Sequence, residues 1–72
     1  MTLIDVIDSI IDEEPPRKVA ESLTTIRKLA EIGDGSAKDK IIVLIEELLD
    51  DANLDAFLRT QLLDVIAETE LL

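Results

Sequence analysis

The sequence contains no cysteine, histidine, tryptophan or tyrosine, and Phe57 is its only aromatic residue. Without cysteine the chain can form neither a disulfide framework nor a thiolate zinc site, and it has no thiol nucleophile. Without histidine it lacks a Ser-His-Asp relay, an HExxH metal site and a side chain that titrates near neutral pH. Proteins that bind single-stranded nucleic acids stack bases on several exposed rings, so one phenylalanine is too few.

Basic residues and long apolar runs are also scarce. Seven Lys and Arg stand against 17 Asp and Glu, for a net charge of −10, which opposes direct binding to nucleic acid. The longest apolar run is Ile41–Ile45, whereas a membrane span needs about 20 residues. The start, Met1–Asp5, has no basic segment of the kind that opens a signal peptide. We therefore expect a soluble cytoplasmic protein with no membrane partner.

An internal repeat organises the residues that are present. The 72 residues are 47% apolar and 33% charged, which is typical of one small globular domain, residues 1–72. The block 3–13 matches the block 41–51 in its apolar and acidic positions, and the helical stripe in 19–30 recurs in 58–69. This pattern predicts four helices near 2–13, 16–32, 37–51 and 54–70, no strand, and two repeats, 2–33 and 37–70.

The repeat period of 38–39 residues lies just below that of HEAT and armadillo arrays. We therefore predict an all-α, four-helix bundle built from two HEAT-like hairpins. If equivalent helices stack on each other, the first and third helices lie side by side. Such arrays usually need about three repeats, so we also expect a homodimer. The residues expected to pack in the core are Leu3, Ile7, Ile10, Val19, Leu23, Ile26, Ile41, Leu44, Ile45, Leu48, Leu58, Leu62 and Val65.

Residues suited to helix ends stand at the junctions. Pro15-Pro16 should end the first helix and begin the second. Gly33 suits a left-handed C-cap, Ser36 an N-cap of the third helix, and Asn53 an N-cap of the fourth.

Acidic residues are concentrated on the first and third predicted helices. They could simply solvate the outer helix faces, or they could attract a basic protein or bind a cation. No twelve-residue calcium-binding loop fits, because the sixth position counted from Asp34 is Asp39 and the twelfth is Ile45. The candidate acidic face consists of Asp5, Asp8, Asp12, Glu46, Glu47 and Asp50.

Four apolar residues stand off the predicted core stripes: Val43, Phe57, Leu63 and Ile32. They could be buried by wide bundle faces, or they could form a homodimer seam or a groove for a partner. Phe57 and Leu63 are expected to contribute most to such an interface.

Arg59 falls within one turn of the apolar stripe of the fourth helix. An arginine in that position usually pairs with a carboxylate, and Asp51 or Asp55 is the expected partner. The acids lie at surface helix spacing and no serine has a histidine base, so the sequence gives no catalytic, metal or cofactor site.

The segments Pro16–Val19, Ile42–Leu48 and Asp51–Leu54, together with Arg59-Thr60 and Glu70, resemble uncharacterised protein family 0147. These are small archaeal all-helical proteins without an assigned activity. The resemblance implies an archaeal cytoplasmic source and a compact helical protein that associates with itself or with a partner. The chain differs from the family pattern at Ala52, Asp55 and Leu63.

These observations predict a non-enzymatic interaction or scaffold module that needs no cofactor and binds itself or another protein. The alternative is an acidic decoy that mimics nucleic acid and occupies a basic protein site. In that case Asp8, Asp12, Glu46 and Asp50 would stand in for phosphates. A third possibility is a divalent-cation binder.

Overall fold

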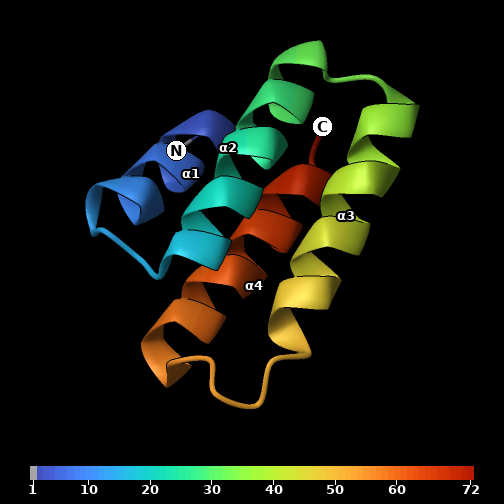
Figure 1. Ribbon diagram of the computed structural model, residues 1–72. Coiled ribbons are helices and arrows are strands. Elements are labelled where there is room, and N and C mark those ends of the chain that lie inside the picture. The colour runs from blue at the N-terminus through green and yellow to red at the C-terminus, as the bar shows by residue number, and fades with distance from the viewer. Residues whose placement is uncertain (1) are drawn as a thin grey trace.

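Four amphipathic segments of the sequence form the helices of the computed structural model, which describes residues 2–72 (Figure 1). They are α1 (Leu3–Asp12), α2 (Arg17–Ile32), α3 (Gly35–Leu49) and α4 (Ala56–Glu70). Each boundary lies within two residues of the predicted one, and residues 2–72 contain no strand. The expected all-helical fold is therefore confirmed.

Polar side chains start three of the helices. Thr2 and Asp5 form a capping box on α1, in which each side chain accepts a hydrogen bond from the other residue's backbone N–H. Asp34 is the N-cap of α3, and its carboxylate accepts a hydrogen bond from the Ala37 N–H at 2.7 Å. The prediction that Ser36 caps α3 was therefore wrong, because Ser36 already lies inside the first turn.

The fourth helix is also capped by an aspartate. The Asp55 carboxylate accepts from the Leu58 N–H at 3.1 Å, so the prediction of an Asn53 cap was wrong. Asn53 lies in the turn before α4, where its own N–H donates to the Asp51 carboxylate at 2.9 Å. Both mistaken predictions chose the right kind of residue two positions away from the true cap.

Backbone geometry ends the first two helices. Gly33 caps α2 at φ +68°, and its N–H donates to the Leu29 carbonyl at 3.0 Å, as predicted. Pro16 is the N-cap of α2, so this helix begins one position later than predicted, and α1 ends at Asp12, before the prolines that were expected to end it. In the connection from α1 to α2, Glu14 takes φ +53° and is the only described non-glycine residue with a positive φ. Its N–H donates to the Ile11 carbonyl at 3.0 Å.

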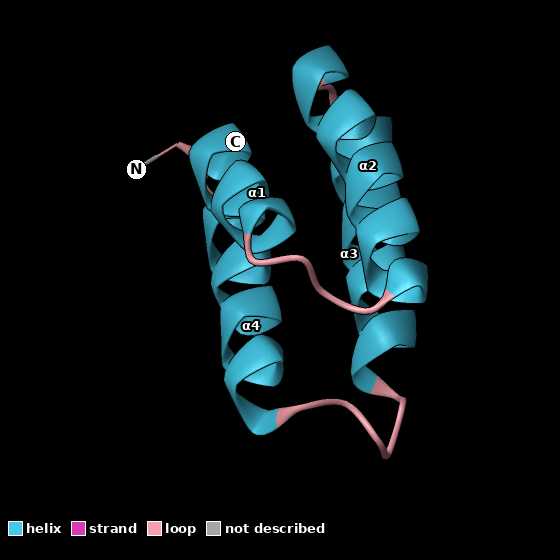
Figure 2. Cartoon of the chain, turned by 60° about the vertical axis from the view of Figure 1, so that its left-hand side comes forward, coloured by secondary structure: helices cyan, strands magenta, loops and turns pink. Residues whose placement is uncertain are grey.

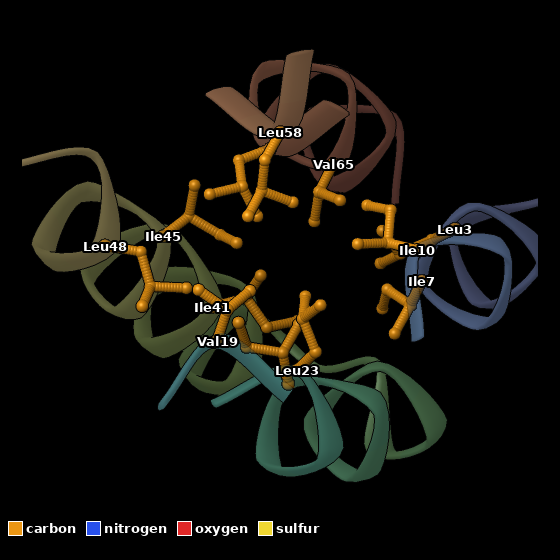
Figure 3. Close-up of a cluster of buried hydrophobic side chains, with 12 residues drawn as sticks. Leu3, Ile7, Ile10, Val19, Leu23, Ile41, Ile45, Leu48, Leu58 and Val65 are labelled. Atoms are coloured by element: carbon orange, nitrogen blue, oxygen red, sulfur yellow. The ribbon is translucent and has the colours of Figure 1, made fainter. Parts of the chain in front are cut away.

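The buried side chains of all four helices meet in one core (Figure 3). Twelve of the 13 predicted packing residues are buried there, and the remaining one, Leu44, is half-buried against them. Ala37 and Thr69 are also buried, and the Thr69 hydroxyl donates to the Val65 carbonyl at 2.7 Å. The radius of gyration is 11.0 Å, which matches the value of about 11 Å for a compact chain of this length.

The helices surround the core in chain order. Each helix packs against the one before and the one after it, and α4 closes the ring against α1 (Figures 2 and 3). The first and third helices therefore lie diagonally across the core. In a HEAT array the equivalent helices of successive repeats are neighbours, so the prediction that α1 and α3 lie side by side was wrong. The physical reason is that two hairpins alone bury more apolar surface by facing each other than by stacking in a row.

No helix within residues 2–72 has the length and apolarity required to cross a membrane.

Candidate functional site

Phe57 lies in the first turn of α4, and 64% of its surface is exposed. It borders an open groove of about 330 Å³ between the start of α4 and the connection from α1 to α2. The groove is lined mainly by apolar side chains, with two carboxylates and one amide among them. The lining residues are Ile10, Glu13, Pro15, Pro16, Asp55, Phe57, Leu58 and Gln61. We refer to these residues as the Phe57 groove.

The groove exists because α1 is shorter than its neighbour α4. α1 has ten residues and α4 has 15, a difference of about 7.5 Å at 1.5 Å per residue. The chain leaves α1 after Asp12 and crosses to α2, so the first turns of α4 extend beyond the end of α1 (Figure 2). One side of this part of α4 is left without a packed neighbour.

Polar contacts hold both walls of the groove in place. The Gln61 side-chain amide donates to the Glu13 carboxylate, which ties the connection to α4. On the other wall, Asp55 is fixed by its hydrogen bond to the Leu58 N–H. The prolines Pro15 and Pro16 restrict the connecting backbone further. These contacts connect the lining residues of the groove to the rest of the fold.

The other three candidate apolar residues do not join Phe57 in one patch. Leu63 follows Arg59 by four residues, so it lies on the side of α4 that faces α3, whereas Phe57 faces the α1–α2 connection. Val43 lies two residues after the buried Ile41, about 200° around α3, and therefore points away from the core. Ile32, the last residue of α2, is 65% exposed.

All four are exposed, so burial within the monomer does not account for them. They lie on different sides of the bundle. Phe57 and Leu63 are six residues apart, which turns them about 120° from each other on the helix, and the interface expected of them stays a prediction.

The predicted acidic face is divided in two. Asp5, Asp8 and Asp12 lie exposed on the outer side of α1 and line a shallow hollow there. Because α1 and α3 are diagonal, the α3 acids belong to a separate surface across the bundle. The six residues of the candidate acidic face therefore do not form one surface. The exposed α3 acids are Glu46, Glu47 and Asp50.

Part of the α1 charge is used within the fold. The Arg27 guanidinium donates to the Asp8 carboxylate at 2.7 Å, and this ion pair joins α2 to α1. Arg27 also pairs with Glu31 on its own helix. Its hydrogen bond to Asp8, together with the attraction of that carboxylate, raises the pKa of Arg27. The hydrogen bond from the Thr2 side chain lowers the pKa of the Asp5 carboxyl. No group of three or more acidic side chains among residues 2–72 is arranged to hold a metal ion.

Arg59 stabilises the α3–α4 connection, but not through a carboxylate. Its guanidinium donates to the carbonyl of Leu49 at 2.8 Å and to the carbonyl of Asp51 at 3.2 Å. The described ion pairs involve Arg17 and Arg27 only, so the prediction of an Arg59 pair with Asp51 or Asp55 was wrong. The last carbonyls of a helix have no partner within the helix, and they compete successfully for the guanidinium here.

Two contacts in the structure were not predicted from the sequence, one at the groove and one at the start of α1. The Glu13–Gln61 hydrogen bond joins residues 48 positions apart, and no local pattern signals it. The capping box of α1 could have been found, because a Thr followed three residues later by an acid marks a helix start.

Compared with known proteins, the chain matches no family model, no curated protein and no solved structure.

Proposed function

We propose that this chain is a small non-enzymatic interaction module whose protein partner docks at the Phe57 groove. The observation that carries the proposal is an aromatic ring 64% exposed beside an open, mainly apolar groove of about 330 Å³. Aromatic side chains are enriched among the residues that contribute most to protein interfaces. Hydrogen bonds and prolines hold the groove walls, so little ordering free energy is lost on binding.

The placement of the carboxylates favours binding over catalysis. A carboxyl group that acts as a general acid needs an apolar environment that raises its pKa. The acids of the α1 and α3 faces are exposed, and the Asp5 pKa is lowered instead. Two related hairpins folded against each other, as the repeat suggests, would supply a scaffold for such a module.

The acidic decoy remains an alternative with a different geometry from the one first expected. A basic partner could use the α1 acids or the α3 acids, but the core separates the two sets. Binding through either acidic face should weaken strongly as salt rises from about 0.1 to 0.5 M, because screening shortens the range of the attraction. Binding that buries Phe57 should lose much less affinity over that range.

The proposal can be tested by photo-crosslinking followed by quantitative binding. A photoreactive phenylalanine derivative replaces Phe57 in one sample and Val43 in a control, since Val43 is also exposed at 55%. Proteins crosslinked only from position 57 are identified, purified and titrated with the original chain, Phe57→Ala and Val43→Ala. We expect Phe57→Ala to weaken binding at least about tenfold and Val43→Ala to leave it unchanged. If no such protein binds with an affinity that depends on Phe57, the proposal fails.

Self-association, cytoplasmic location and membership of uncharacterised protein family 0147 stay predictions. A homodimer is tested by sedimentation equilibrium with interference optics, because a chain without Trp or Tyr absorbs little near 280 nm. Twice the chain mass would confirm it. Cation binding would appear as a calcium- or magnesium-dependent rise in melting temperature that EDTA reverses.

A further inference from the structure

The chemistry of the Phe57 groove specifies more than an apolar contact. Its floor includes Ile10 and Leu58, which are only 1% and 6% exposed. Phe57 and the two prolines add further apolar lining, and the exposed residues Glu13 and Asp55 add carboxylates to it. A ligand that fills this groove must combine an apolar group with groups that suit negative charge.

No positively charged side chain among residues 2–72 lines the groove. Arg17 follows Pro16 directly, but its guanidinium pairs with Glu21 at 2.9 Å. Arg59 is two residues after Phe57, about 200° around α4, and donates to the carbonyls of Leu49 and Asp51.

The flanking sequence adds further acids to the same region. Asp12 and Glu14 stand on either side of Glu13, and both are exposed. The whole chain carries a charge of −10, so the potential around the groove is negative at long range as well.

We propose that the occupant of the Phe57 groove is a segment of a basic protein. The segment inserts an aliphatic or aromatic side chain between Phe57 and the Pro15-Pro16 wall. Lysine or arginine residues within about one helical turn of that anchor reach Glu13 and Asp55. This inference rests on the proposed function and deepens it by giving the chemistry of the partner.

Two features of the groove support a protein segment with this pattern. A volume of about 330 Å³ is at the lower limit for small-molecule pockets, and this groove is open, so it suits one or two protruding side chains better than a fully enclosed ligand. The exposed face of Phe57 can also attract a lysine or arginine through its ring electrons.

The same charges oppose a second copy of this chain as the occupant. A second copy would bring a further charge of −10 and would place its own Glu13 and Asp55 near those of the first. Like charges facing each other across an interface cost binding free energy and prevent close approach.

The inference can be tested by two-dimensional ¹H–¹⁵N NMR titration of the isotope-labelled chain with short synthetic peptides. The first peptide carries one leucine flanked by lysine and arginine. The second replaces that leucine by serine at the same charge, and the third replaces the basic residues by glutamate. We expect the first peptide to shift the amide signals of Ile10, Phe57, Leu58 and Gln61. We expect the second and third peptides to bind at least about tenfold more weakly.

Variants of the chain separate the apolar part of the site from the charged part. Phe57→Ala should weaken the first peptide at least about tenfold, and Val43→Ala should have no effect. The double variant Glu13→Gln, Asp55→Asn should weaken it severalfold and reduce the dependence of affinity on salt. Both replacements keep an acceptor oxygen, and asparagine is a good N-cap, so the hydrogen bonds to Gln61 and Leu58 are retained.

Four outcomes would overturn the inference. Binding that depends on Phe57 but is equal for the basic and acidic peptides would refute a basic partner and leave the proposed function standing. Binding of the basic peptides that ignores Phe57→Ala and shifts the amides of the α1 or α3 acids would refute both proposals and support a decoy. Groove signals that shift on dilution of the chain alone would identify a second copy as the occupant. Failure of all three peptides to bind would also overturn the inference.

Discussion

Replacing Arg59 should destabilise the fold more than the removal of one surface charge normally does. The half-buried guanidinium donates to the carbonyls of Leu49 and Asp51, and so it links α4 to the end of α3. A hydrogen bond to a charged group contributes about 1.5–3 kcal/mol. The Asp51 contact is exposed, and water can replace it. We therefore expect Arg59→Ala to lower the free energy of unfolding by about 2 kcal/mol, the contribution of the Leu49 bond alone.

The chain is small, so this loss should be plain in a melting curve. For a domain of 60–100 residues, 1 kcal/mol corresponds to about 4–8 °C, which gives a fall in Tm of about 8–16 °C. Thermal unfolding followed by far-ultraviolet circular dichroism is the appropriate assay. Arg59→Lys should lower Tm by roughly half as much as Arg59→Ala, because an ammonium group lacks the fixed fork with which a guanidinium donates to both carbonyls.

Arg17→Ala is the matched control because it changes the net charge by the same amount. Its ion pair with Glu21 is on the surface, with the Arg17 side chain 92% exposed, and such helix pairs contribute about 0.3–0.5 kcal/mol. Subtracting the Tm change of Arg17→Ala from that of Arg59→Ala removes the destabilisation that comes only from increasing the net negative charge. If the two variants melt at the same temperature, the carbonyl contacts of Arg59 do not stabilise the fold and the reasoning is refuted.

Three further predictions concern the backbone, the acid range and the core. Glu14→Gly should raise the free energy of unfolding by about 0.5–1 kcal/mol in urea titrations, because glycine takes the left-handed φ of +53° without steric cost; an equal gain for Glu14→Ala would contradict this explanation. The pKa of the Asp5 carboxyl is lower in the folded chain than in the unfolded chain, so the ionised carboxyl stabilises the fold at pH values above the unfolded pKa of about 3.8. This stabilisation is lost as the pH falls through the folded pKa. Thr2→Ala should therefore reduce Tm near neutral pH, and the gap to the original chain should narrow below pH 3.8; a gap that stays constant with pH would exclude this linkage. Leu23→Ala should cost about 2–5 kcal/mol in the same titrations, because the side chain is 0% exposed and leaves a cavity, and a loss below 1 kcal/mol would mean that the core collapses around it.

The sequence predicted the helices and the core well because both depend on apolar periodicity. Ile7, Leu23, Ile41 and Leu62 fall on stripes with the spacing of a helix, and all four are 0% exposed. Periodicity identifies the face of a helix that is buried, but it does not identify the helix that covers this face. The neighbour of α1 was therefore predicted wrongly even though its buried residues were predicted correctly.

The site was harder to predict because it depends on contacts between distant parts of the chain. Phe57 stands off the core stripe, so its exposure was visible in the sequence. The groove beside it results from the early end of α1, which the local pattern predicted, and from the Glu13–Gln61 hydrogen bond, which no local pattern signals. Arg59 was recognised as structural, but its partners are backbone carbonyls, which a sequence does not display.

The up-and-down order of the helices places the beginning of α1 and the end of α4 at the same end of the bundle (Figures 1 and 2). The Phe57 groove lies toward the opposite end, where α1 finishes and α4 starts. A reporter protein or a surface linkage attached at either terminus would therefore leave the groove free for measurement. A short flexible linker could also join the two termini and allow the chain to be opened between α2 and α3, at Gly33-Asp34. Such a circularly permuted chain would retain all four helices and the groove while moving both attachment points to another part of the molecule.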